Sequence, residues 1–465
     1  MRTRIGTIKK QMKRLCSGLL ILAGCISLSS QVVLAADWPD DVSVSSPSAI
    51  VMDYSTGTIL YEKNANEQLY PASITKIMTA LLAIENCDMD EIVTFSEDAV
   101  YNTEGSSIAR DVGEEMTMEQ CLYGMMLESA NECAYAIAEH VAGSEEAFVE
   151  MMNEKAAELG CTNTHFDNTN GLPDEEHYTS AYDMALIAQA AYSNETFRLI
   201  VGTSYYEIPA TNKHDEITYL RNHHNMLYPY SSYDYLYDYC VGGKTGYTTE
   251  ANSTLVTYAQ KGDMILICVI MNASSPDHYT DTITLFDYCF ENFQLWNISE
   301  NESSYSDPLE SFFDSTAQIF SNSLSLLSID EDAQIVLPLN VDFSAAESTV
   351  IESSEGDSAG VIQYTYADRV VGTANLILSN ESLEITLPSE ESGDASGDAG
   401  KIVIHLGQIL LGVLGALLVA ALIVAILYFQ KNFFILKHKM ETKNRSLGKN
   451  QDTRRDRRER RRRRR

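Results

Sequence analysis

Three short stretches of the sequence carry residue types that suit acyl transfer to and from a serine. In chain order they are Ser73-x-x-Lys76, Ser129-x-Asn131 and Lys244-Thr245-Gly246. A serine hydroxyl is a poor nucleophile until a neighbouring base takes its proton, and two residues three positions apart lie on one face of a helix. The first stretch alone is weakly specific, because a serine there can be no more than a helix N-cap. Three such stretches in one chain point to a shared site.

Lys76 can act as the base only while its amine is neutral. The residues after it are mostly apolar, which predicts a helix packed on the core and a partly buried ammonium group. Burial and a second cation, Lys244, both lower the pKa of a lysine. We therefore predict Ser73 as the nucleophile, Lys76 as its general base, and Ser129 as the group that passes the proton to the leaving amine. Asn131 can orient the substrate amide.

The third stretch suits the binding of a peptide that ends in a free carboxylate. Lys244 and Thr245 fit a carboxylate by charge and by hydrogen bond, and Gly246 lets a substrate backbone lie close to the strand. The backbone amides of Ser73 and Tyr247 are candidates for an oxyanion hole. This scheme needs no cofactor and no metal, and the sequence contains no CxxC or HExxH spacing.

Hydrophobic periodicity predicts the elements that must position these stretches. A hairpin is expected first, then helices, then strands beyond Cys240 and a closing helix. The ranges are 48–63 for the hairpin, 73–85, 116–141 and 144–159 for the helices, "GGKTGY", "NSTLVTYAQ" and "MILICVIMNA" for the strands, and 279–293 for the closing helix. This order predicts an α+β domain over residues 37–300. Short β-rich runs then predict a small separate domain over 301–387.

Both ends of the chain carry membrane-targeting patterns. Residues 1–36 combine six Lys and Arg with an apolar stretch and a cleavage pattern near Ala35 or Ala36, which predicts a secretory signal peptide. A lipoprotein box ending at Cys25 is an alternative. Residues 388–401 are polar and predict a flexible linker, and residues 402–430 predict a transmembrane helix. The basic tail, 431–465, is expected in the cytoplasm, next to the membrane rather than on nucleic acid.

The exported body between these ends is strongly acidic. Of the 33 Lys and Arg, six precede residue 37 and sixteen follow residue 430, and of the 66 Asp and Glu four follow residue 430. The body therefore has 11 cations against 62 acids, so we expect it to repel polyanions and to bind divalent cations loosely. Seven cysteines remain in it, an odd number, in apolar patterns that favour buried free thiols.

With the three motifs in this order, the sequence resembles the low-molecular-mass penicillin-binding proteins that are D-alanyl-D-alanine carboxypeptidases. The blocks that carry the resemblance are "TGTILYEKNANEQLYPASITKIMTA", "EGSSIA", "ESANECAYAIAEHVAGS", "NTHFDNTNGLPDEEHYTSAYDMALIA" and "GGKTGYT". It implies a penicillin-binding/serine β-lactamase-like transpeptidase domain that removes the terminal D-alanine from peptidoglycan pentapeptide stems through an acyl-Ser73 enzyme. It also implies binding of β-lactam antibiotics and a β-rich second domain that holds the catalytic domain off the membrane.

Two features depart from that family. Many members anchor through an amphipathic C-terminal helix in the membrane surface, whereas this sequence predicts a full span. Many also carry an arginine early in the last strand of the catalytic sheet, where it helps to bind the terminal carboxylate. Ile265 stands in that part of the strand, with no cation. The residues that could bind the terminal carboxylate in place of this arginine are Arg221, His223 and His224, and the sequence leaves all three as alternatives.

Two other functions compete with this interpretation. A β-lactamase shares the three motifs and often adds a glutamate that speeds hydrolysis of the acyl-enzyme, for which Glu175 and Glu176 are the candidates. A catalytically silent wall-binding sensor that signals through the basic tail is the second alternative, and the intact motifs speak against it.

Overall fold

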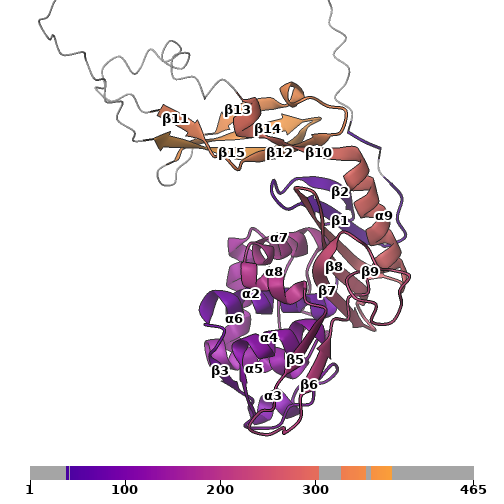
Figure 1. Ribbon diagram of the computed structural model, residues 1–465, viewed down its shortest axis with the longest axis vertical. Coiled ribbons are helices and arrows are strands. Elements are labelled where there is room, and N and C mark those ends of the chain that lie inside the picture. Colours follow the sequence, from indigo (N-terminus) through magenta and orange to yellow (C-terminus); the bar gives the residue numbers. More distant parts are fainter. Residues whose placement is uncertain (1–37, 41, 303–325, 352–357, 380–465) are drawn as a thin grey trace, which may run out of the picture. The chain divides into compact units, whose positions relative to one another are not determined.

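The computed structural model describes residues 38–40, 42–302, 326–351 and 358–379 (Figure 1). All of these residues lie within one compact unit of the chain. The predicted signal peptide 1–36, linker 388–401, transmembrane helix 402–430 and tail 431–465 lie outside the described residues. Within the part that is described, every helix is too short or too polar to cross a bilayer.

Residues 42–292, the region that holds the three predicted catalytic motifs and is named the catalytic region, are built around a five-stranded antiparallel sheet in the order β2-β1-β9-β8-β7. Its strands are β1 (Ser48–Asp53), β2 (Ile59–Lys63), β7 (Cys240–Thr248), β8 (Asn252–Lys261) and β9 (Met264–Ala273). The predicted hairpin and the three later strands are thereby confirmed. β1 pairs with β9 although more than 200 residues separate them in the chain, and β7 is an edge strand whose outer side pairs with no other strand among the described residues.

The sheet is buried on both faces. Along each inner strand, alternate side chains enter two different cores, as the period of two requires: Ile50 and Val256 face one, Val51 and Leu255 the other. The second core is covered by α9 (Asp277–Asn292), which lies on the opposite face from the other helices (Figure 1). The closing helix that the sequence predicts over 279–293 is therefore confirmed.

Seven helices and four short strands complete the catalytic region. They are α2 (Lys76–Asn86), α3 (Glu97–Tyr101), α4 (Met118–Leu127), α5 (Asn131–Ala142), α6 (Glu145–Glu158), α7 (Ala181–Tyr192) and α8 (Glu195–Val201), with β3 (Ile92–Thr94), β4 (Glu115–Thr117), β5 (Tyr205–Ile208) and β6 (Thr218–Arg221). The predicted helices 73–85 and 144–159 are confirmed as α2 and α6, the first of them preceded by a 3-10 turn.

The single helix predicted over 116–141 is wrong. The segment begins in β4, continues as α4 and then breaks before α5. Thr117 caps α4 through a capping box with Gln120, and Ser129 takes a left-handed backbone conformation with φ of 63° that no helix accommodates. The helical spacing of apolar residues continues across the break because α4 and α5 pack against the same core, so the sequence pattern does not show where one helix ends.

The remaining described residues form strands with a core of their own. β10 (Phe293–Asn297) pairs with β12 (Gln334–Pro338), while β11 (Leu326–Ile329), β13 (Glu347–Ile351), β14 (Ser358–Tyr366) and β15 (Arg369–Ser379) make a second sheet. The single turn α10 (Ile298–Asn301) follows β10, and the 3-10 turn η2 (Phe343–Ala345) lies between β12 and β13. Buried side chains such as Leu337, Ile362 and Tyr364 fill this core.

Candidate active site

The predicted nucleophile lies on a short turn that leads directly into a helix. Ser73 belongs to the 3-10 turn η1 (Ala72–Thr75), and Lys76 is the first residue of α2. The hydroxyl of Thr254 on β8 donates a 2.7 Å hydrogen bond to the carbonyl of Pro71 just before the turn. Gly171 lies against the same turn so closely that a Cβ there would be 1.9 Å from the oxygen of Ala72. The turn is thus held from two sides.

The side chain of Lys76 is fully buried and contacts three oxygen atoms. Its Nζ lies 3.1 Å from Ser73 Oγ, 2.7 Å from Asn131 Oδ1 and 2.6 Å from the carbonyl oxygen of Asn170. Burial, and then the nearby positive charge of Lys244, hold the pKa of Lys76 well below its ordinary value. The nearby Glu132 carboxylate acts in the opposite direction.

These contacts suit a neutral amine. A neutral amine has two N–H donors and one lone pair, and the oxygens of Asn131 and Asn170 can only accept. If both N–H bonds point to those oxygens, the lone pair faces the hydroxyl of Ser73, which then donates to it. The Asn131 amide is fixed in this orientation because its Nδ2 donates to the carbonyl of Glu104. Lys76 is therefore positioned to take the proton of Ser73.

The second and third motifs meet beside this pair. Ser129, in the break between α4 and α5, lies with its Oγ 3.1 Å from Nζ of Lys244 on β7. Lys244 Nζ also donates a 2.7 Å hydrogen bond to the carbonyl of Thr245. Burial lowers the pKa of Lys244 to about 7. The structure therefore brings together the predicted residues of all three motifs.

A cleft of about 890 Å³ opens over these residues. Its lining includes Ser73, Ser129, Thr245, Gly246 and Tyr247, and Tyr247 is 69 % exposed. Because a Cβ on Gly246 would lie 2.9 Å from the backbone nitrogen of Ser73, only a glycine lets β7 approach the nucleophile this closely. The free edge of β7 can pair with an extended peptide.

The candidates for a replacement of the missing arginine lie in different places. His223 lines the cleft, with its Nε2 2.8 Å from a carboxylate oxygen of Glu128. His224 is buried, and its Nε2 lies 3.0 Å from Thr257 Oγ1 on β8. Arg221 does not line the cleft. His223 is therefore the one of the three that can reach a ligand there.

Two histidines at this site were not among the residues predicted from the sequence. His278 of α9 lines the cleft, and its Nδ1 has no hydrogen-bond partner among the described residues. The ring of His177 supports the turn of Ser73: its Nδ1 accepts a 3.0 Å bond from the amide of Asp167, so its Nε2 carries the proton and donates to Thr75 Oγ1 at 2.9 Å. The block "NTNGLPDEEHYT" around His177 was the available signal.

Comparison with known proteins decides the family. Residues 34–275 match the model of the peptidase family S11, D-alanyl-D-alanine carboxypeptidase. The chain belongs to this family. It is 38 % identical over 291 residues to the D-alanyl-D-alanine carboxypeptidase DacF of Bacillus subtilis, an alignment that covers 61 % of this chain and 72 % of the relative. It is 32 % identical over 289 residues to the D-alanyl-D-alanine carboxypeptidase of Streptomyces sp. strain K15, an alignment that covers 59 % of this chain and 95 % of the relative.

A solved structure supports the fold of this S11 peptidase. The crystal structure of the Streptomyces K15 DD-transpeptidase is similar with a TM-score of 0.50 and 30 % identity, covering 54 % of this chain and 99 % of that chain. The penicillin-binding-protein-like fold, the serine peptidase class and the D-alanyl-D-alanine carboxypeptidase function that the family resemblance implied are thus confirmed. The predicted free thiol is confirmed for six of the seven cysteines: Cys87, Cys121, Cys133, Cys161, Cys240 and Cys268.

Proposed function

We propose that this chain removes the terminal D-alanine from peptidoglycan stem peptides through an ester on Ser73. The observation that carries the proposal is the 3.1 Å contact of Lys76 Nζ with Ser73 Oγ, beside two oxygen atoms, of Asn131 and Asn170, that can accept both N–H bonds of a neutral amine. As the bond from Ser73 Oγ to the peptide carbonyl carbon forms, the proton passes to Lys76 Nζ.

The leaving group then takes up a proton. The peptide C–N bond breaks, and the nitrogen of the released D-alanine receives, by way of Ser129 in the lining of the cleft, the proton that Lys76 took from Ser73. Lys244 Nζ, 3.1 Å from Ser129 Oγ, stabilises the negative charge that develops on this oxygen as its proton passes to the nitrogen. A water molecule then attacks the ester carbonyl carbon and gives a proton to the neutral Lys76. The bond from that carbon to Ser73 Oγ breaks, and Lys76 returns a proton to Ser73 Oγ as the shortened stem peptide leaves.

The substrate is held by β7 and by the turn of Ser73. Its backbone lies along Gly246 at the free edge of the sheet, Asn131 orients its amide, and its terminal carboxylate binds near Lys244 and Thr245. The amides of Ser73 and Tyr247 bind the oxyanion, and each such donor is worth roughly 3 to 4 kcal/mol of transition-state stabilisation.

β-Lactam antibiotics acylate the same serine. In a β-lactam the amide is part of a strained ring, so its cleavage by Ser73 leaves the former leaving group attached and close to the ester. Glu175 and Glu176, the candidates for a deacylating glutamate, are both exposed, and neither lines the cleft. This favours a peptidase over a β-lactamase.

The membrane arrangement rests on the sequence. A signal peptide exports the catalytic region to the cell-wall side, a single helix within 402–430 anchors it in the cell membrane, and the basic tail 431–465 stays in the cytoplasm. Protease added to intact cells is expected to remove the catalytic region while an epitope placed after residue 465 survives. Loss of both would overturn this topology.

Two assays on one preparation test the function. Release of D-alanine from a diacyl-D-Ala-D-Ala peptide is expected from the wild type and not from Ser73→Ala, and added benzylpenicillin is expected to give a long-lived adduct. Rapid turnover of the penicillin without release of D-alanine would indicate a β-lactamase. Neither activity from a folded protein would indicate a binding module.

A further inference from the structure

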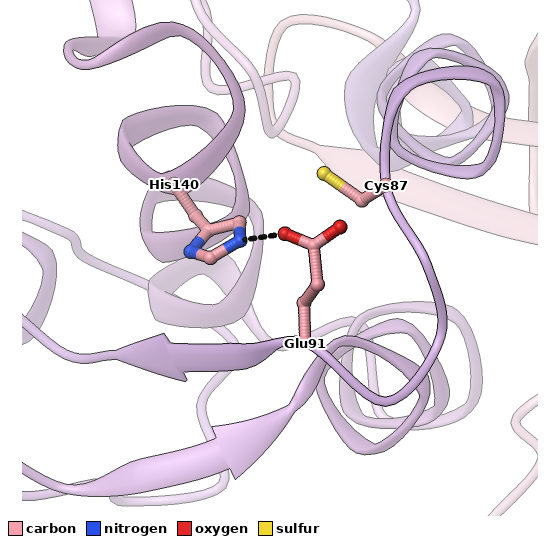
Figure 2. Close-up of side chains that lie close together, drawn as sticks. All are labelled: Cys87, Glu91 and His140. Atoms are coloured by element: carbon pink, nitrogen blue, oxygen red, sulfur yellow. Dashed lines mark hydrogen bonds and ion pairs between the residues drawn. The ribbon is translucent and has the colours of Figure 1, made fainter.

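Three side chains with different metal-binding atoms meet far from the catalytic cleft. Cys87 follows the last residue of α2, Glu91 directly precedes β3, and His140 lies in the last turn of α5. Figure 2 shows the thiol, the carboxylate and the imidazole pointing toward one another. One ligand atom from each lies within 4.8 Å of the other two, and Nε2 of His140 is 2.9 Å from Oε2 of Glu91.

The spacing of these atoms fits one tetrahedral ion with small adjustments. Zn–S bonds of ~2.3 Å and Zn–N or Zn–O bonds of ~2.1 Å place neighbouring ligand atoms about 3.4 to 3.6 Å apart. The observed separations, from 2.9 Å to no more than 4.8 Å, lie on both sides of that range. The side chains of His140 and Glu91 are 24 % and 41 % exposed, so solvent can enter and supply a fourth ligand.

The backbone around the cluster is held in place. The amide of Asp88 donates a 2.8 Å bond to Oε1 of Glu91, which leaves Oε2 toward His140. The carbonyl of Glu91 accepts a 2.8 Å bond from the amide of Met118, and that of Met89 a 3.0 Å bond from the amide of Glu119. A loop fixed in this way loses little entropy when it binds an ion.

We propose that Cys87, Glu91 and His140 form a binding site for zinc or a similar thiophilic divalent cation. Thiolate, imidazole and carboxylate together suit zinc, cadmium or cobalt rather than magnesium or calcium, which take oxygen ligands. Binding forms the metal–sulfur, metal–nitrogen and metal–oxygen bonds and releases the thiol proton of Cys87 to solvent. The hydrogen that His140 Nε2 now donates to Glu91 is also given up to solvent, and the neutral ring keeps its proton on Nδ1, so that the Nε2 lone pair faces the ion. The acidic surface of the exported body, including Asp88 and Asp90 in the same loop, raises the local concentration of cations.

The proposed metal site lies at the C-terminal ends of α2 and α5, the two helices whose first residues belong to the active site. α2 starts at Lys76 and α5 starts at Asn131, and these two side chains are hydrogen-bonded at 2.7 Å. Cys87 and His140 lie at the other ends of the same helices, about 16 Å away along α2 at 1.5 Å per residue. A bound ion therefore ties α2 to α5 at the end opposite the active site and stabilises their packing.

The competing explanation is that His140 and Glu91 form an ion pair that binds no metal. Binding of cobalt distinguishes this explanation from a metal site. With the protein kept reduced, Co²⁺ is expected to give the near-ultraviolet charge-transfer band of a cobalt–thiolate bond, and Zn²⁺ to remove it by competition. Zn²⁺ at about a hundred times its Kd is also expected to raise the Tm by several degrees.

Conservative variants locate the site. Cys87→Ser is expected to lose the cobalt–thiolate band, and His140→Gln is expected to bind Zn²⁺ at least about tenfold more weakly than the wild type. In the presence of a chelator, the Tm of each variant is expected to differ from that of the wild type by less than the increase that zinc gives to the wild type. The matched controls Cys161→Ser and His165→Gln, outside the cluster, are expected to bind like the wild type. No thiolate band in the wild type, or equal zinc affinity in all five proteins, would overturn the proposal.

Discussion

Replacing Asn131 by aspartate tests the environment of the base most sharply. The substitution keeps the shape of the side chain but places a carboxylate where the amide oxygen now lies, 2.7 Å from Nζ of Lys76. At that separation the attraction between unit charges is about 1.5 kcal/mol in bulk water and about 6 kcal/mol at an effective dielectric constant of 20. Since one pKa unit is ~1.4 kcal/mol, the pKa of Lys76 should rise by about one unit or more.

The sign of the effect on activity follows from the role of Lys76. A general base must be neutral, so kcat/KM of the free enzyme rises with pH through the pKa of Lys76. In Asn131→Asp this acidic limb of the profile should move to higher pH, and the activity lost near neutral pH should partly return in alkali. The assay is kcat/KM for D-alanine release, or the second-order rate of penicillin acylation, measured across pH.

Glu132→Gln provides the matched control with the opposite sign. The Glu132 carboxylate accepts bonds from Ser107 Oγ and the amide of Ile108, both 2.7 Å, and its charge raises the pKa of Lys76. Removing the charge should move the acidic limb to lower pH. If Asn131→Asp lowers activity equally at every pH and leaves the limb in place, the group titrating there is not Lys76, and the reasoning about the base fails.

Three further predictions concern the base, the turn of the nucleophile and the acidic surface. Lys76→Arg should lose at least about tenfold in kcat/KM, or ~1.4 kcal/mol, because a guanidinium keeps its proton; more than about a tenth of wild-type activity would speak against a base at this position. Gly171→Ala should lower the Tm and abolish penicillin labelling, because the new Cβ would lie 1.9 Å from the oxygen of Ala72. The control Gly160→Ala, with a similar positive φ but open space around it, should keep full labelling. Equal effects of the two substitutions would show that backbone strain alone matters. The value of kcat/KM for an anionic peptide should rise between ~0.01 and ~0.15 M salt, because the Debye length falls from ~30 to ~8 Å and screens the distant acids first; a steady fall would mean that Lys244 and its neighbours steer the substrate.

The sequence was sufficient to predict the residues of the site because each motif is short and local. Ser73 and Lys76 lie one helical turn apart, and the edge strand with Lys244 follows from its own pattern of residues. The strands of the sheet were equally predictable, because their apolar runs are bounded by turns. Burial of Lys76 followed from the apolar residues around it in the chain.

Other features depend on contacts that no local pattern reports. The break at Ser129 rests on one left-handed residue between two helices that share a core. The acceptor from Asn170 is a backbone carbonyl, so its residue type carries no signal. His278 and the cluster of Cys87 with His140 come together only through the tertiary fold, across long stretches of chain.

Mapping the acylated residue tests the central claim most directly. The full-length protein is treated with a penicillin, the intact mass is measured, and the modified peptide is sequenced by tandem mass spectrometry. The mechanism predicts one adduct with the mass of the whole penicillin, on Ser73, and none on a folded Ser73→Ala variant. An adduct on any other residue, or acylation of Ser73→Ala at the wild-type rate, would contradict it.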